Sequence, residues 1–152
     1  MQTGKGLSIE FRDYTGCYFE KCLELFELNC PAYFAEEERE DFKHFLRSQS
    51  GPYFLGFSNN TFVCCFGMSR HSEVDCSLNW IMVHPDYQHG GYGAAMMSYF
   101  LDYVANLGMQ KVFIATSQYA KSFFEKYGAE QLDFIEDGWG KGMHRINMEL
   151  NL

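Results

Sequence analysis

The segment at residues 80–93 constrains the fold of this chain more than any other part of the sequence. An apolar stretch that ends at Val83 is followed by a glycine-rich turn, and the turn opens into a segment with helical spacing. Glycines allow the backbone to approach a bound group closely, and the first amides of a helix have no acceptor within that helix. Because these amides also lie at the positive end of the helix dipole, the segment predicts a binding site for a phosphate or pyrophosphate.

Other glycine-rich phosphate-binding motifs fit the chain less well. No Gly-x-x-x-x-Gly-Lys-Ser/Thr pattern occurs, which excludes a P-loop. The glycines at positions 90, 91 and 93 do not form the Gly-x-Gly-x-x-Gly pattern of a dinucleotide fold either. The remaining alternative is an ordinary strand-to-helix turn that happens to be rich in glycine.

Several segments resemble those of the GNAT superfamily of N-acetyltransferases. The spacing Gln88-x-x-Gly91-x-Gly93 resembles the coenzyme A signature of that family. Residues 120–129, Ala-x-x-Phe-Phe-Glu-Lys-x-Gly-Ala, resemble its Ala-x-x-Phe-Tyr-Glu-Lys-x-Gly-Phe helix. Residues 137–150 look like its closing hairpin, and residues 26–46 look like the two leading helices of a bacterial subgroup. The likeness covers most of the chain and is specific for fold and cofactor rather than for substrate.

The composition indicates one globular domain that covers residues 1–152. Apolar residues make up 47% of the chain and aromatic residues 18%, which is enough to fill a core without disulfides or metals. The net charge of −8 and the pI near 5.0 disfavour binding to nucleic acid or anionic lipid. We find no secretory leader and no apolar stretch of the ~18 residues that a membrane span requires, so we expect a cytoplasmic protein without a membrane partner.

The cysteines support the same location. None of the six forms a Cys-x-x-Cys pair, and two of them are adjacent on an expected strand, where their side chains point to opposite faces. The pattern is typical of reduced, buried thiols, and we expect no metal site.

Hydrophobic periodicity predicts a mixed α/β protein. We expect strands at residues 7–11, 52–57, 61–68, 73–83, 112–115, 132–137 and 143–150. We expect helices around residues 18–26, 36–47, 91–108 and 120–128, with a left-handed cap at Gly108. A turn at residues 138–142 would join the last two strands. The resemblance implies the GNAT fold, in which helices flank a mostly antiparallel central sheet that splays between its fourth and fifth strands.

The resemblance also implies the residues that bind acetyl-CoA. Its pantetheine arm would pair with the backbone of the fourth strand at Met82 and Val83. Ser117 would cap the following helix and contact the pantetheine. Phe124 stands where the family usually carries the tyrosine that protonates the leaving thiolate, so the chain departs from the family there. The pyrophosphate would rest on the amides of Gln88, His89, Gly90, Gly91, Tyr92 and Gly93.

The group that accepts the proton of the amine is not evident from the sequence. The strand positions where family members often carry a carboxylate are Ser77 and Asn79, which are not bases but would line a substrate pocket. Glu73 and Asp75 precede them and could act through water, although such carboxylates are more often only solvated. His144 shares a strand face with apolar residues and is a further candidate, with a structural role as the alternative.

Tyr127 and the acidic residues 36–41 each have a functional and a structural interpretation. Tyr127 lies three residues after Phe124, near the same helix face, and is the first candidate for a relocated acid; a core tyrosine is the alternative. The acidic residues 36–41 could steer a cationic amine, but we interpret them as the first turn of a helix, where acidic side chains complement the dipole.

These observations predict an acetyl-CoA-dependent N-acetyltransferase that transfers acetyl directly to a primary amine, on a small molecule or a protein. No cysteine falls in the matched motifs, so an acetyl-enzyme is not indicated. The alternative is an acyl-CoA-binding or regulatory module of the same fold without efficient catalysis, because Phe124 and the missing strand carboxylate depart from the family. An exposed edge in the closing hairpin could support a homodimer.

Overall fold

A computed structural model describes residues 7–48 and 51–152 of the chain. The described residues form a seven-stranded sheet in the order β1-β2-β3-β4-β5-β7-β6. The strands are β1 (Glu10–Asp13), β2 (Tyr53–Ser58), β3 (Thr61–Arg70), β4 (Asp75–Val83), β5 (Lys111–Thr116), β6 (Glu130–Gly140) and β7 (Met143–Asn151). Neighbouring strands are antiparallel except for the parallel pair β4 and β5, so the predicted mostly antiparallel sheet is confirmed.

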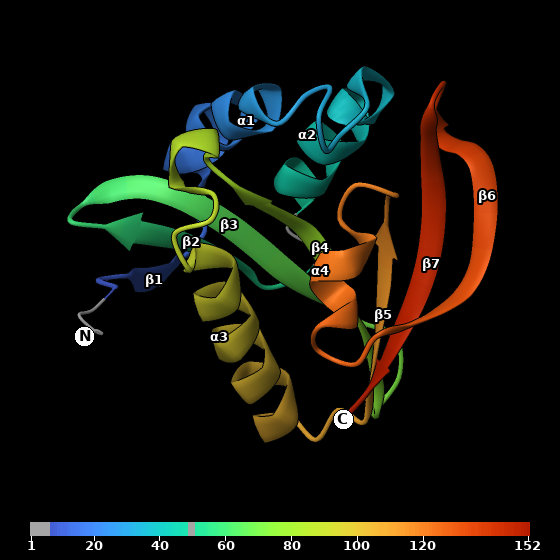
Figure 1. The fold of residues 1–152 in the computed structure, drawn as a ribbon. Helices are drawn as coiled ribbons and strands as arrows, with labels where there is room; N and C mark the ends of the chain where they lie inside the picture. The colour runs from blue at the N-terminus through green and yellow to red at the C-terminus, as the bar shows by residue number, and fades with distance from the viewer. Residues whose placement is uncertain (1–6, 49–50) are drawn as a thin grey trace.

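Helices flank the sheet on both sides. The α-helices are α1 (Phe19–Leu28), α2 (Arg39–Ser48), α3 (Tyr92–Asn106) and α4 (Lys121–Glu125), and short 3₁₀ helices are η1 (Gly16–Tyr18), η2 (Glu36–Glu38) and η3 (Pro85–Tyr87). Figure 1 shows α1 and α2 together above the sheet, α3 below it, and the pair β6 and β7 at its far edge. Within the described residues, no helix combines the length and apolar character needed to cross a membrane.

Each helical layer has its own core. On one side, Phe26 of α1 stacks on Phe42 of α2 with ring centroids 5.6 Å apart, and both are fully buried against the sheet. On the other side, buried residues of α3 such as Phe100 pack against Phe66 of β3. The alternation of side chains along β2 and β3 supplies apolar residues to both layers, which holds the sheet between them.

The sheet opens between β4 and β5. The two strands pair only as far as Leu78 and Ile114. Beyond that point β5 continues to pair with β7, whereas β4 remains paired with β3. The predicted splay between the fourth and fifth strands is therefore confirmed.

A bulge distorts β4 at the point where the sheet opens. The register with β3 shifts between Cys65 and Gly67, and Trp80 there has a positive φ of 47°. The hydroxyl of the buried Tyr53 donates a hydrogen bond of 2.7 Å to the Trp80 carbonyl and so fixes the bulge. A bulge re-aims side chains and leaves one residue outside the ladder, which suits a strand that borders a site.

Some element bounds differ from those expected. The first strand begins at Glu10 rather than at residue 7, and α4 has only five residues. The strand β6 extends to Gly140, through most of the turn predicted at residues 138–142. Its glycines accommodate an irregularity within the strand, where the register shifts and Asp137 has a positive φ of 52°, and the chain reverses only afterwards. The left-handed cap predicted at Gly108 is confirmed by its φ of 84°.

Candidate functional site

A cavity of about 830 Å³ occupies the opening between β4 and β5. This volume is within the usual range of small-molecule sites. Its walls come from the ends of β4 and β5, the glycine-rich turn, α4, η2 and the closing hairpin. One continuous space therefore connects the predicted anion site with the segment before α2.

The glycine-rich turn has the backbone geometry of an anion site. His89 and Gly91 both have positive φ angles, of 66° and 90°. Gly91 is the N-cap of α3, and its carbonyl accepts the first helical hydrogen bond, from Ala95 at 3.0 Å. The amides of the first turn of α3 precede this bond and lack helical acceptors, as at any helix start. The turn thus places several donors at one end of the cavity.

Gly93 and Tyr92 serve the packing of this turn. A Cβ at Gly93 would come within 2.9 Å of the Phe123 ring, so a larger residue here would displace that ring. The Tyr92 hydroxyl lies 3.1 Å from Ser58 Oγ, and neither the Tyr92 side chain nor Gly90 lines the cavity. Of the predicted residues in the turn, Gln88, His89, Gly91 and Gly93 border the cavity directly.

The side chain of Gln88 connects the turn to β4 and α1. Its Nε2 donates to the Val83 carbonyl at 3.2 Å and to Asn29 Oδ1 at 3.3 Å. The buried Asn29 also donates to the Val83 carbonyl, at 3.2 Å. Met82 and Val83 line the cavity as expected, but a ligand that pairs with the Val83 carbonyl would compete with these two hydrogen bonds.

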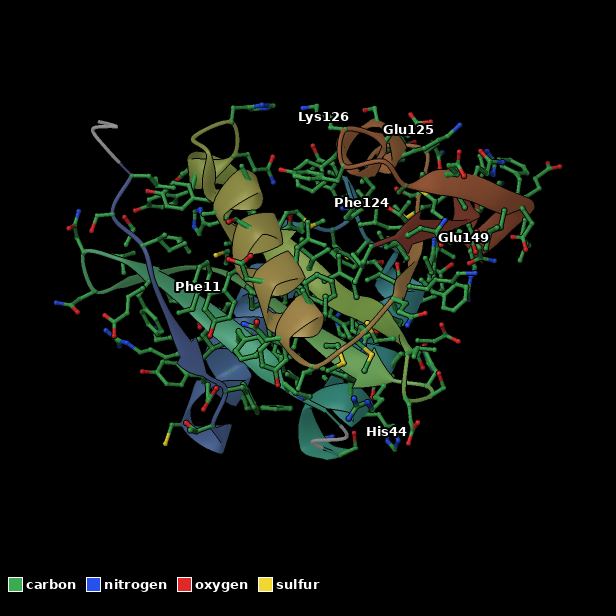
Figure 2. All side chains as sticks on the ribbon, turned by 90° about the horizontal axis from the view of Figure 1, so that it is seen from below. Phe11, His44, Phe124, Glu125, Lys126 and Glu149 are labelled. Carbon is green, nitrogen blue, oxygen red and sulfur yellow. The ribbon has the colours of Figure 1, made fainter. Side chains whose placement is uncertain are left out.

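Three other predicted residues border the cavity, one directly after β5 and two within or just after α4. Ser117 is buried, and its Oγ accepts a hydrogen bond of 3.3 Å from the Tyr119 amide. Phe124 is buried as well, and Figure 2 shows it directed inward while its neighbour Glu125 lies on the outer side. Tyr127 also lines the cavity, together with Lys126, a cation within the motif at residues 120–129.

Three other predicted residues lie outside the cavity, and of Ser77 and Asn79 only Asn79 borders it. Glu73 is exposed in the connection before β4, and Asp75 begins that strand, about 13 Å from Asn79 at the usual rise per residue. Ser77 donates to Asn79 Oδ1 at 3.1 Å without bordering the cavity itself. The structure does not bring these carboxylates to the anion site.

His144 belongs to a hairpin contact outside the cavity. Its Nδ1 accepts a hydrogen bond of 3.0 Å from the Asp137 amide, and its ring packs on Phe134 with centroids 5.1 Å apart. These partners explain its orientation without a catalytic role. Among the described residues, no group of three His, Cys, Asp or Glu side chains is arranged to hold a metal ion.

Glu38 is the carboxylate that the structure places in the cavity. It closes η2, directly before α2, and is only 6% exposed. Its Oε2 accepts a hydrogen bond of 2.8 Å from the Ala35 amide. Burial raises the pKa of Glu38 from its ordinary value of 4.5 to about 7, with smaller raising effects of Asp41 and Glu37. The Ala35 amide and the Arg145 charge act in the opposite direction and lower this pKa. A carboxyl group with a pKa near neutrality is suited to accept a proton.

The closing hairpin supplies the opposite wall. Arg145 of β7 borders the cavity, and its guanidinium carbon lies 4.8 Å from the centre of the Trp139 ring. Trp139 in turn donates from Nε1 to the Thr116 carbonyl at 2.9 Å, which ties the hairpin to the end of β5. A Cβ on Gly140 would lie 2.8 Å from the Glu37 carboxylate, so the hairpin also meets η2 closely.

Among these residues, Glu38 has a signal in the sequence. Glu38, Phe42 and Leu46 recur at a spacing of four, and all three are buried, so Glu38 lies on the inner face of the acidic run. Trp139 and Arg145 had no such signal, because their positions depend on the strand irregularity in β6.

The chain was also compared with known proteins. A sequence model described as the acetyltransferase (GNAT) family matches residues 19–129. No curated protein sequence matches the chain.

Three solved structures illustrate the likeness in fold. The ribosomal-protein-S18-alanine N-acetyltransferase of Escherichia coli has a TM-score of 0.79 at 14% identity, over 94% of this chain and 93% of that one. A GNAT family acetyltransferase of Elizabethkingia anophelis, solved with acetyl-CoA bound, has a TM-score of 0.73 at 18% identity, over 95% and 99% of the two chains. The spermidine N-acetyltransferase of Vibrio cholerae, in complex with CoA and spermine, has a TM-score of 0.74 at 14% identity, over 95% of each chain.

Proposed function

Since this chain belongs to the acetyltransferase (GNAT) family, we propose that it transfers the acetyl group of acetyl-CoA directly to a primary amine. The observation that carries the proposal is the continuous cavity, which joins the glycine-rich turn at one end to the Glu38 carboxyl group at the other. An anion site and a base in one space are what acetyl transfer from a pyrophosphate-bearing thioester requires.

The cavity suits acetyl-CoA as the acetyl donor. The amides at the start of α3 would bind the pyrophosphate, and Lys126 is close enough to the same space to add a positive charge. The opening between β4 and β5 would hold the pantetheine arm against Met82 and Ser117. Two of the similar structures, those from Elizabethkingia anophelis and Vibrio cholerae, were solved with acetyl-CoA and CoA respectively.

Glu38 would make the amine nucleophilic. An alkylammonium group has a pKa near ~10.4 and must lose a proton before its nitrogen can attack. The ionised Glu38 would accept that proton as the new nitrogen–carbon bond forms and the carbon–sulfur bond breaks. A β4 amide outside the ladder at the bulge would stabilise the oxyanion, and Tyr127 would protonate the departing thiolate.

The cysteines support direct transfer rather than an acetyl-enzyme. Among the described residues that border the cavity, none is a cysteine. Burial also raises the pKa of Cys64 to about 12, so that thiol is a poor nucleophile near neutral pH. All six cysteines are free, which supports the further proposal of a reducing, cytoplasmic location.

The test is release of free CoA thiol from acetyl-CoA in the presence of a panel of primary amines, with calorimetric titration of acetyl-CoA in parallel. We expect binding together with amine-dependent thiol release. Tight binding with only the slow release seen in water would instead support a binding or regulatory module, which the buried Phe124 at the usual tyrosine position also favours. Absence of acetyl-CoA binding would overturn both functions.

Two further expectations remain proposals. The chain would form a single domain, and a homodimer could pair through β6 at the sheet edge. Its exposed apolar side chains Leu132, Phe134 and Ile135 support such a contact.

A further inference from the structure

Glu38 and Arg145 line the cavity without a direct ion pair between them. We call the part of the cavity beside these two residues the acceptor end. Glu38 uses one oxygen for the Ala35 amide, and its other oxygen has no hydrogen-bond partner among the described residues. Arg145 donates from Nε to Asn147 Oδ1 at 2.9 Å. None of the ion pairs formed by the described residues involves Arg145. The terminal nitrogens of its guanidinium group are therefore available to a ligand.

Arg145 is held in a geometry that suits an anion. Its stacking on Trp139 orients the planar guanidinium group, and the hydrogen bond from Nε fixes one edge of that group. A guanidinium group binds a carboxylate through two parallel hydrogen bonds, and the pair is stronger where solvent is partly excluded. Because the chain has a net charge of −8, an unpaired, half-buried arginine beside a cavity is a specific feature and not part of a general basic surface.

The walls between these charges are aromatic. Trp80 stacks on Phe34 with centroids 5.9 Å apart and an angle of 22°, and both border the cavity. Trp139 lies on the hairpin side, and Tyr33 and Tyr119 are partly exposed at the rim. Flat aromatic surfaces bind apolar or aromatic groups of a ligand by burial and ring contact.

Resting on the proposed acetyl transfer, we propose that the acceptor is a free amino acid with an apolar or aromatic side chain. Its carboxylate binds Arg145, its amino group lies toward Glu38, and its side chain packs between Trp80 and Trp139. A polyamine offers no anion to Arg145, and the amino terminus of a protein has no free carboxylate next to its amine. These two acceptor classes are therefore disfavoured.

Matched probes separate the carboxylate from the rest of the acceptor. Phenylalanine, tryptophan and methionine would each be compared with the amine that lacks the carboxyl group, such as 2-phenylethylamine for phenylalanine. We expect kcat/KM for at least one amino acid to exceed that of its amine by about 10- to 100-fold, the range of a charged bidentate contact. In Arg145→Gln this preference should fall to near unity. Loss of the Arg145 charge also raises the pKa of Glu38 and lowers the rate with both probes, so the ratio between the two probes is the readout.

The control variant is Arg47→Gln. Arg47 on α2 stacks on Phe19 at the same 4.8 Å as Arg145 on Trp139, but it lies outside the cavity. We expect it to keep the wild-type preference for the amino acid. An equal loss for both probes in Arg145→Gln would show that Arg145 only supports the hairpin, and would overturn the proposal.

A binding measurement keeps the inference testable if the protein proves inactive. Calorimetric or NMR titration of the same probes in the presence of CoA should show tighter binding of the amino acid than of its amine, again dependent on Arg145. Amino acid binding without thiol release would contradict acetyl transfer but support the ligand class. Thiol release with amines that lack a carboxylate, at equal or better efficiency, would leave acetyl transfer intact and overturn the ligand class. Failure of all the amino acids to bind would overturn it as well.

Discussion

The two ends of the cavity are built in different ways. At the cofactor end, the donors come from the backbone of one continuous segment, the turn at residues 88–93. At the acceptor end, Glu38, Trp80, Trp139 and Arg145 come from four separate elements and span more than 100 residues of sequence. Backbone recognition leaves a local pattern of glycines, whereas a cluster of distant side chains leaves none. We therefore expect mutations at the cofactor end to act through backbone geometry and those at the acceptor end through charge.

The largest expected effect is the loss of cofactor binding in Gly91→Val. A valine at this turn would occupy the approach of the phosphate, so we expect acetyl-CoA affinity to fall by at least 100-fold in calorimetric titration. Gly108→Val is a closely matched control, because both glycines bracket α3 with similar positive φ angles, 90° and 84°, and neither has a crowded Cβ position. The control should show the same backbone strain in thermal unfolding but normal affinity. Unchanged affinity in Gly91→Val would mean that the turn is only structural.

The next effect concerns the proton that the leaving thiolate must receive. Phe124 cannot supply it, so we expect Tyr127→Phe to lower kcat by about 100-fold, the low end of the contribution of a general acid. Introducing Phe124→Tyr into that variant should recover part of the rate, since the new hydroxyl would enter the same cavity. Tyr103→Phe is the control, because Tyr103 of α3 packs on Phe54 of β2 and does not border the cavity.

The tyrosine experiment has a clear contradicting result. If kcat is unchanged in both Tyr127→Phe and Phe124→Tyr, the thiolate leaves without help from a hydroxyl at either position. The cofactor end would then act through its backbone donors without supplying an acid.

The same contrast explains what could be predicted from the sequence. The strands and helices follow from periodicity, and the anion turn follows from glycines at fixed spacing, which are local properties. The opening of the sheet was expected from the resemblance to the GNAT family. The sequence prediction treated the acidic run as a solvated helix start, although Glu38 shares the spacing of the buried Phe42. The position of Arg145 could not be predicted, because an irregularity within β6 sets how the hairpin meets η2. Side chains that converge from distant strands depend on such details of register.

A smaller effect is expected in the pH dependence of stability. The pKa of Glu38 is about 7 in the folded chain and near 4.5 in the unfolded chain, so protonation of this carboxyl group favours the folded chain. Its contribution to the free energy of unfolding is complete below about pH 4.5. This contribution is lost as the pH rises through about 7. Glu38→Gln should therefore raise the free energy of unfolding relative to the wild type at pH 8 by about 1–3 kcal/mol more than at pH 4. Chemical denaturation at the two pH values measures this difference, and an equal change at both would show that Glu38 is not desolvated.

The most direct test of Glu38 as the base is the pH dependence of acetyl-CoA-dependent thiol release in Glu38→Gln. The control is Glu40→Gln on the adjoining helix α2, whose carboxylate is 78% exposed and pairs with Lys43 at the surface. We predict that the wild type and the control gain activity through about pH 7, as Glu38 loses its proton, whereas Glu38→Gln binds acetyl-CoA normally but loses 100-fold or more of kcat together with that rise. A Glu38→Gln variant that retains the wild-type rate and pH profile would show that Glu38 is not the base.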